Sequence, residues 1–367
     1  MMKPFQIDSL INRDKSPCIS IIIPTDRINA SKNYELLKKS IKKAKALLLS
    51  KALPEDVTKE LISKIDMSST RIPETVSEGL GFFISQAQYN VVTFPFKVKH
   101  KVIVDNSFSH RDLFYLKQYS TPYYVLNLSK RGVHLLKGNL DELDEIKNEK
   151  FPLLYEDQFE YEPASAASSN SNSLKGYEKE KTQITEIRLR SVFRDADASV
   201  KPLLSDETKL LLAGTQKMIS LFAGVTTLGD HLNGKVTGSY DENNIQRLRE
   251  NAWSAFCRIS KKEIARQVED LQEKRNGHLA EGIRQAWAAA IEGKGLMLVV
   301  EKDFHHLAYR KEGLNRIQLQ PPEKPYAIIP DAVEDVIEAA YSKKGKLVFT
   351  ENGQLKEFDH VALVLRY

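Results

Sequence analysis

Short apolar runs alternate with longer stretches of helical periodicity along most of the chain. In its first part, the continuous apolar run at residues 18–23 predicts a buried strand, and apolar side chains at helical spacing predict a helix at 33–51. Residues 79–94 predict a hairpin, and valines alternating with lysines predict a half-buried strand at 97–104. The turn-rich sequence that follows indicates a domain boundary near residue 119.

The second part opens with a hairpin pattern at residues 123–136, in which Gly132 supplies the positive φ of a tight turn. Residues 163–173 are almost entirely Ala, Ser and Asn, which predicts an exposed, mobile loop. Apolar side chains at helical spacing then predict a helix over 189–203, and 210–213 predict a short buried strand. This part is therefore expected to run as hairpin, long loop, basic helix and strand.

A Gly- and Asn-rich stretch at 224–244 predicts a loop, and apolar side chains at helical spacing predict a long helix at about 242–273. The third part of the chain begins after this helix. Residues 303–325 predict a polar connection within it. The third part predicts a compact α/β pattern with helices at 279–292 and 331–345. Its strands are predicted at 296–300, 346–350 and 360–367.

These patterns predict an α/β protein of three domains, a number that 367 residues can accommodate. The first is an N-terminal α/β domain at 1–118. The second is a central domain at 119–275, with a long flexible loop at 156–183. The third is a small C-terminal α/β domain at 276–367.

Composition changes this picture little. With 41% hydrophobic and 28% charged residues, the chain is typical of an ordinary globular protein. The N-terminal sequence lacks the apolar core of a signal peptide, and no apolar run approaches the ~18 residues of a membrane span. Cys18 and Cys257 lie far apart in sequence, which favours reduced thiols. We therefore expect a cytoplasmic protein with no membrane partner.

Positive charge is densest in the predicted helix at 33–51, and the net charge of +5 is compatible with a nucleic-acid partner. No acidic residue lies between residues 36 and 51. The candidate RNA-binding residues of this helix are Lys38, Lys39, Lys42, Lys43 and Lys45. A merely solvated helix face is the alternative. A second cationic set would extend the patch if its strand lies beside this helix: Lys97, Lys99 and Lys101.

The basic helix after the long loop carries three further candidates for contact with RNA phosphates, which are Arg188, Arg190 and Arg194. Acidic neighbours accompany them, Glu186 on one side and Asp195 on the other. Solvated surface arginines are therefore the alternative. No DNA partner is expected.

Enzymatic motifs are absent from the sequence. It contains no phosphate-binding loop, no dinucleotide-binding fingerprint and no paired-histidine metal motif. Asp195 and Asp197 are two residues apart on a predicted helix and therefore do not share a face, and the adjacent His305 and His306 are expected in a loop. We expect no cofactor, no metal and no recognisable catalytic residue, which favours a non-enzymatic protein without deciding the question.

Several strings, in this order, resemble the archaeo-eukaryotic peptide-chain release factor and pelota superfamily. Residues 124–139 (YVLNLSKRGVHLLKGN) resemble the strand pair that opens its central domain, and 211–214 (LLAG) resemble a later central strand. Residues 281–300 (EGIRQAWAAAIEGKGLMLVV) and 361–367 (VALVLRY) are similar to the start and the final strand of its third domain. Because residues 24–27 (PTDR) resemble the opening of the bacterial and archaeal branch, the chain is identified as a member of that branch, in its family 3.

The resemblance implies a central domain with a ribonuclease-H-like sheet and a third domain with the fold of the kink-turn-binding ribosomal proteins. It implies binding to the ribosome or tRNA, with a translational GTPase as a further partner. In true release factors, the loop between hairpin and helix carries Gly-Gly-Gln, which positions water against the peptidyl-tRNA ester. The corresponding loop here, at about 163–183, has no Gly-Gly-Gln and carries Leu174, Lys175, Gly176 and Tyr177 at that position.

The sequence therefore predicts a translation-linked factor that binds the ribosome or tRNA in ribosome rescue, stalling or stress response and lacks the Gly-Gly-Gln hydrolytic motif. Two alternatives stay open. One is a hydrolase of peptidyl-tRNA or a related ester that uses a non-standard loop. The other is a protein-interaction module on the same fold.

Overall fold

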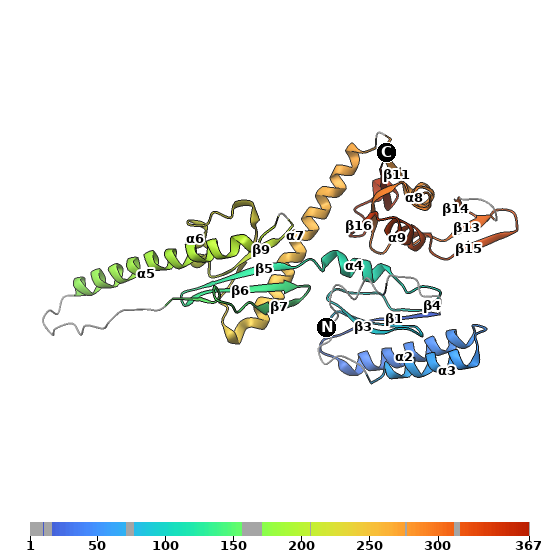
Figure 1. The fold of residues 1–367 in the computed structure, drawn as a ribbon, viewed down its shortest axis with the longest axis horizontal. Helices are drawn as coiled ribbons and strands as arrows, with labels where there is room; N and C mark the ends of the chain where they lie inside the picture. Colours follow the sequence, from blue (N-terminus) through green and yellow to red (C-terminus); the bar gives the residue numbers. More distant parts are fainter. Residues whose placement is uncertain are drawn as a thin grey trace. The chain divides into compact units, whose positions relative to one another are not determined.

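The computed structural model describes residues 10, 17–70, 77–155, 171–205, 207–275, 277–311 and 316–366. The chain folds into two compact units (Figure 1). The split unit combines the two ends of the chain, Met1–Ser120 and Glu263–Tyr367, and the central unit comprises Thr121–Lys262. Across the described ranges, no helix has both the length and the apolar character that crossing a membrane requires.

The N-terminal half of the split unit is a four-stranded sheet in the order β3-β2-β1-β4. β1 (Cys18–Pro24) lies between β2 (Gly79–Ile84) and β4 (Lys101–Asp105) and is antiparallel to both. β3 (Tyr89–Phe94) pairs with β2 and confirms the predicted hairpin. The continuous apolar sequence of β1 fits its central place, because every residue except the last is buried.

Two helices, α2 (Ala30–Leu49) and α3 (Glu55–Met67), lie side by side against this sheet (Figure 1). Leu37 of α2 and Leu61 of α3 are buried together with Ile21 of β1 in one apolar core. α2 confirms the predicted helix, whereas the sequence analysis did not predict α3. The pair forms a layer whose outer surface carries the lysines considered below.

The C-terminal half of the split unit contains a second four-stranded sheet, in the order β11-β17-β12-β16. β12 (Gly295–Glu301) is parallel to β16 (Lys346–Thr350) and antiparallel to β17 (Val361–Leu365), which pairs in turn with β11 (Leu279–Glu281). The helices of this half are α8 (Gly282–Ile291) and α9 (Ala332–Ser342). The predicted strands and helices of the third part of the chain are thus confirmed, except that the first helix begins three residues later, after β11.

A small antiparallel sheet, β14-β13-β15, lies where the sequence analysis predicted only a polar connection. Its strands are β13 (Ala308–Lys311), β14 (Ile317–Gln318) and β15 (Tyr326–Ile329). The prediction is wrong for this segment because strands of two to four residues are too short to show a reliable period.

Helix α4 (Arg111–Tyr119), which the sequence analysis also missed, links the two halves of the split unit by contacting β16. The Gln118 side chain donates a hydrogen bond to the carbonyl of Phe349 (3.0 Å) and accepts one from its backbone N–H (2.7 Å). β16 is an edge strand, so the Gln118 amide supplies the two hydrogen bonds that a neighbouring strand would make.

Arg111 provides a second link between the halves. It is 5% exposed, and its guanidinium lies 2.7 Å from a carboxylate oxygen of Asp331 and 3.2 Å from one of Glu334. It also donates a hydrogen bond to the carbonyl of Phe304. A buried cation is thus satisfied by two acidic groups and a carbonyl that lie about two hundred residues further along the chain.

The central unit is built on a sheet in the order β10-β9-β5-β6-β7. The predicted hairpin is confirmed as β5 (Tyr123–Ser129) and β6 (Gly132–Asn139), which are antiparallel. The predicted buried strand is confirmed as β9 (Lys209–Gly214), parallel to β5. Three short strands complete the sheet, namely β7 (Glu142–Glu145), β8 (Leu153–Leu154) and β10 (Leu232–Thr237).

Gly132 is required at the hairpin turn for two reasons. Its φ is +137°, in a region that side chains with a Cβ rarely adopt. In addition, a Cβ at this position would lie 2.1 Å from the carbonyl oxygen of Leu153, because β8 pairs closely with the start of β6. The turn therefore has no room for any other residue.

Two predictions for the central unit are wrong. Of the flexible loop predicted at 156–183, residues 156–170 lie outside the described residues, but the backbone is helical from the start of α5 (Ser171–Val200). The loop predicted at 224–244 contains β10, which runs parallel to β9. The long helix that follows is confirmed as α7 (Ile245–Glu273), and it continues across the boundary between the units.

The mixed α/β composition with several sheets is therefore confirmed. The ribonuclease-H-like and kink-turn-binding folds and the three domain boundaries stay predictions. The observed division groups Met1–Ser120 with Glu263–Tyr367, so two of the three predicted domains belong to one compact unit.

Candidate nucleic-acid interface

Helix α2 turns its lysines away from the sheet. The Asn29 side chain caps the helix by accepting a hydrogen bond from the Lys32 N–H (3.0 Å), and the apolar stripe that includes Leu37 and Leu48 is buried. Lysines between these apolar positions therefore lie on the other faces. The exposed ones are Lys38, Lys39, Lys42 and Lys43, and Lys45 is half-buried.

Helix α3 contributes to this surface, although the sequence analysis did not anticipate it. The Asp66 carboxylate lies 2.5 Å from the Lys45 ammonium, so Lys45 is held in an ion pair and its charge is partly neutralised. The signal for α3 was present in the sequence. Val57, Leu61 and Ile65 recur four residues apart directly after Pro54, which ends the preceding loop.

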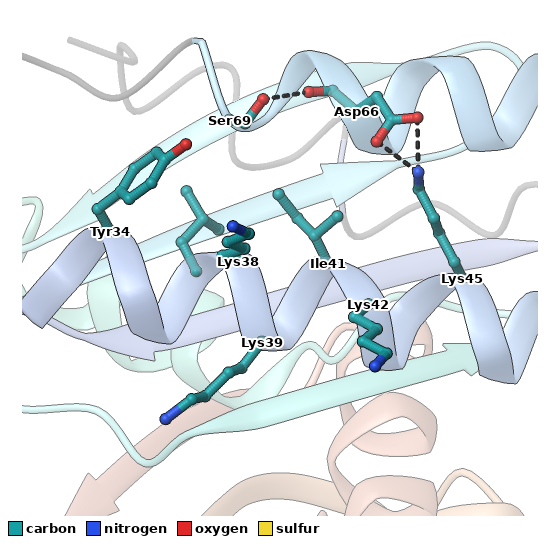
Figure 2. Close-up of a pocket in the computed structure, with 9 residues that line it drawn as sticks. Tyr34, Lys38, Lys39, Ile41, Lys42, Lys45, Asp66 and Ser69 are labelled. Atoms are coloured by element: carbon teal, nitrogen blue, oxygen red, sulfur yellow. Dashed lines mark hydrogen bonds and ion pairs between the residues drawn. The ribbon is translucent and has the colours of Figure 1, made fainter.

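An open pocket of about 520 Å³ lies between α2 and α3. Figure 2 shows Lys45 extending to Asp66 across it, whereas Lys39 points away from α3. The residues that line it are Tyr34, Leu37, Lys38, Lys39, Ile41, Lys42, Lys45, Asp66 and Ser69. The surface thus combines lysine side chains with apolar ones such as Leu37 and Ile41. A row of cations of this kind suits a nucleic-acid backbone, whose phosphates are regularly spaced.

Lys43 lies close to His100. The Nε2 of His100 is 2.8 Å from the buried Ser40 hydroxyl. Burial and the charge of Lys43 both lower the pKa of His100, which keeps the imidazole neutral near pH 7. His100 therefore adds no positive charge to the lysine surface at this pH.

The second cationic set predicted from the sequence is partly engaged in ion pairs, and its contribution to this surface stays a prediction. β4 begins at Lys101, and Lys101 pairs with the buried Asp112 (2.7 Å), while Lys99 lies 3.4 Å from a carboxylate oxygen of Asp303. The Lys97 carbonyl accepts a hydrogen bond from Lys302 (3.0 Å). The Lys99 side chain and the Lys97 backbone thus contact the C-terminal half of the split unit, whereas Lys101 pairs within the N-terminal half.

The three candidate arginines lie on α5 in the central unit. Arg188 and Arg194 are exposed, and Arg190 is half-buried beside Gly224. The neighbouring Glu186 lies 2.5 Å from the Lys217 ammonium, and this ion pair lowers the pKa of Glu186. The helix surface is therefore of mixed charge, and its contact with RNA stays a prediction.

The residues at the Gly-Gly-Gln position, Leu174, Lys175, Gly176 and Tyr177, lie in the first turns of α5. Only their backbone is described, and it is helical. Figure 1 shows this end of α5 extending away from the sheet of the central unit. The predicted loop is therefore a helix here.

Asp197, one of the two carboxylates considered in the sequence analysis, is held by hydrogen bonds within the central unit. Asp197 is 5% exposed and accepts hydrogen bonds from the Thr226 hydroxyl (2.5 Å) and from the Thr227 N–H and hydroxyl (3.1 and 2.7 Å). It thereby fixes the segment after α6 (Gln216–Ala223). Within the part of the chain that the structure describes, no three histidine, cysteine or acidic side chains gather as metal ligands would.

Glu301 and His360 form a pair that the sequence analysis did not identify. Glu301 is 4% exposed on β12, and its carboxylate accepts hydrogen bonds from the Leu355 N–H and from the His360 Nδ1, both at 2.9 Å. Burial alone would raise the pKa of Glu301. The bonds from the Gly353 and Leu355 N–H groups and from His360 outweigh burial and lower it.

Glu301→Gln is expected to destabilise the split unit by about 1.5–3 kcal/mol at pH 7, because an ionised acceptor is lost. A lowered carboxyl pKa contributes stability above the unfolded pKa, and this contribution is lost as pH falls through the folded pKa. The difference between wild type and variant should therefore shrink in acid. Urea denaturation followed by ¹⁹F NMR of protein labelled with 5-fluorotryptophan, at the resonance of the buried Trp287, measures it.

Glu292→Gln is the matched control, since Glu292 is exposed at the end of α8 and pairs only with the exposed Lys294. It should cost no more than about 1 kcal/mol. An equal loss in the two variants, or a Glu301 effect that does not depend on pH, would contradict the role assigned to this carboxylate.

The hairpin that leads through α5 to a parallel central strand, and the α/β half at the C-terminal end, follow the order of elements that the resemblance to the release factors implies. Comparison with known protein families gives a more specific result. Residues 122–294 match the bacterial archaeo-eukaryotic release factor family 3. The resemblance predicted from the sequence is thereby confirmed, and the chain is release-factor-like and translation-related.

Other comparisons are more distant. No curated protein sequence matches the chain. Among solved structures, the archaeal termination factor aRF1 is 14% identical with a TM-score of 0.25, covering 100% of this chain and 99% of that chain. Archaeal Pelota bound to the ribosome with ABCE1 is 11% identical with a TM-score of 0.41, covering 100% and 95%. Archaeoglobus fulgidus Pelota is 13% identical with a TM-score of 0.39, covering 81% and 86%. Similarities this low carry no argument of their own.

Proposed function

We propose that this protein is a cytoplasmic, translation-linked factor that engages the ribosome or tRNA in rescue, stalling or stress response. Its RNA contact is the lysine face of α2, defined as Lys38, Lys39, Lys42 and Lys43. The family match supports the link to translation. A translational GTPase is a further expected partner.

The exposed cluster of lysines is the observation that carries the proposal. Four lysines lie on consecutive turns of one helix, and no acidic residue lies between residues 36 and 51. Each phosphate contact should add about 0.7 to 0.9 to the slope of the logarithm of the binding constant against the logarithm of salt concentration. Four contacts therefore predict a slope of about 3, with binding that weakens steeply as salt rises.

The test is co-sedimentation of the full chain with ribosomes on sucrose gradients at low and high salt. The wild-type protein should migrate with ribosomal particles at low salt and leave them at high salt. The variant K38E/K39E/K42E/K43E should reduce the ribosome-bound fraction at low salt by at least about tenfold. Lys45 is left unchanged, since it is paired with Asp66.

A matched control reverses four exposed lysines of the C-terminal half, Lys343, Lys344, Lys346 and Lys356, and changes the net charge by the same amount. It should leave co-sedimentation near the wild-type level. If both variants lose the same ribosome-bound fraction, the change in net charge alone explains the loss. Wild-type binding by the lysine-face variant would overturn the proposal and favour the protein-interaction module. The hydrolase alternative gains no specific support, since the residues at the Gly-Gly-Gln position form helical backbone.

A further inference from the structure

The small sheet β14-β13-β15 has one covered face and one open face. Ala308 and Ile317 are 0% and 1% exposed and belong to the covered face. Because side chains alternate along a strand, Tyr309 lies on the opposite face together with its cross-strand partners Ile328 and Gln318. Ile328 is 61% exposed, so the described residues leave this face open to solvent.

Two tyrosines make the open face aromatic. Tyr326 pairs with Lys311 across the strands and therefore shares the face with Tyr309. The two rings meet edge to face, with centroids 5.3 Å apart and planes at 89°. This contact fixes the orientation of both rings and leaves their remaining surfaces beside the exposed Ile328.

Positive charge accompanies these rings. Among residues 307–329, four side chains are cationic and two, Glu312 and Glu323, are acidic. Lys311 lies on the face itself, next to Tyr326. The cationic residues are Arg310, Lys311, Arg316 and Lys324, and all four are exposed. Of these, Lys311 shares the face of the tyrosines and Arg310 lies on the opposite face. An apolar protein partner would not require a cation beside the rings, whereas a phosphate backbone would.

We propose that this tyrosine face, defined as Tyr309, Lys311, Tyr326 and Ile328, binds a single-stranded segment of RNA. Unpaired bases stack on the rings and on Ile328, while the surrounding cations contact the phosphates. Duplex RNA would fit poorly, because its bases are already stacked and paired. The site is separate from the lysine face of α2 and would provide a second RNA contact in the same unit.

The test measures the fluorescence anisotropy of a labelled oligouridylate of about ten nucleotides with the full chain at low salt. Tyr326→Ala should weaken binding roughly 5- to 100-fold, whereas Tyr326→Phe, which keeps the ring, should stay within about twofold. Lys311→Ala removes an exposed cation without disturbing packing and should lower the salt slope by about 0.7. Unlabelled duplex RNA should compete at least about tenfold more weakly than the single strand.

Three results would overturn the proposal: an oligouridylate that does not bind, equal binding by Tyr326→Ala and wild type, or equal losses in the Ala and Phe variants. The first is the outcome expected if a protein covers this face. The lysine-face variant K38E/K39E/K42E/K43E separates the two proposals. If it still binds the oligonucleotide in a Tyr326-dependent manner, the tyrosine face stands whatever the ribosome co-sedimentation shows.

Discussion

Arg111→Met should destabilise the split unit by about 3 kcal/mol, the lower end of the range for breaking a buried ion pair. The guanidinium is 5% exposed and is the shared partner of Asp331 and Glu334. Methionine fills the space but leaves two carboxylates facing each other beside the Phe304 carbonyl. The expected loss of stability is at the lower end of this range because both carboxylates are partly hydrated: 25% of the Asp331 side chain and 33% of the Glu334 side chain are exposed to solvent.

The effect of Arg111→Met should depend on pH. Burial raises the pKa of Glu334, and the charge of Arg111 opposes this rise. Without Arg111, the pKa of Glu334 should rise further. A raised carboxyl pKa favours the folded state only while the group is protonated, and this contribution is lost as pH rises through the folded value. The variant should therefore lose more stability at pH 7 than at pH 4.

The two tryptophans of the chain allow each unit to be followed separately, because Trp287 belongs to the split unit and Trp253 to the central unit. In protein labelled with 5-fluorotryptophan, ¹⁹F NMR during a urea titration resolves both. Arg111→Met should lower the midpoint for Trp287 and leave that for Trp253 unchanged.

Two controls test the cause of the Arg111 effect. Arg27→Met removes an exposed arginine that lies 3.7 Å from Glu78, and it should cost no more than about 1 kcal/mol. Adding Asp331→Asn and Glu334→Gln to Arg111→Met should recover most of the loss, because no buried charge is then left without a partner. A triple variant as unstable as Arg111→Met would show that lost packing, not charge, is responsible.

Gly132→Ala should destabilise the central unit by about 2–4 kcal/mol, and here the Trp253 midpoint should move while that of Trp287 stays. An alanine must adopt the φ of +137°, and its Cβ must displace the Leu153 carbonyl from a separation of 2.1 Å. With alanine at position 132, the hairpin turn and the pairing of β6 with β8 cannot both keep their geometry.

Gly229→Ala separates these two causes. Gly229 also has a positive φ, of +48°, but a Cβ there would meet nothing within 4 Å. Gly229→Ala should therefore destabilise the central unit by only about 1–2 kcal/mol, which is the cost of placing an alanine at a positive φ without any steric clash. If Gly132→Ala and Gly229→Ala cost the same, the close approach of β8 is not what requires glycine at the hairpin.

The sequence predicted the elements whose signals are local. The β5–β6 hairpin carries its turn residue, β1 and β9 carry continuous apolar runs, and α2 carries apolar side chains at helical spacing. β10 was missed for a different reason. Its Gly234 indicated a loop, but a Cβ there would lie 2.8 Å from the Ile259 side chain, so this glycine permits α7 to pack closely. Only tertiary structure distinguishes these two uses of glycine.

The candidate site was predicted in part. The lysines of α2 were recognisable because no acidic residue interrupts them, whereas the pairing of Lys45 with Asp66 depends on α3 lying alongside. The burial of Arg111 could not have been predicted, since its acidic partners are far away in sequence and seven of the nine residues of α4 are buried, charged ones included. The tyrosine face depends in the same way on the register of strands only two to four residues long.

The bonds from Gln118 to Phe349 and from Arg111 to Asp331 also set an order of events during synthesis of the chain. The partners are 231 and 220 residues apart, and translation at about 5–20 residues per second separates their appearance by tens of seconds. The contiguous central unit is complete before those partners emerge. Until then, Arg111 and Gln118 of α4 lack the partners that they contact in the folded chain, so the N-terminal half reaches its final packing only after the C-terminal half has emerged.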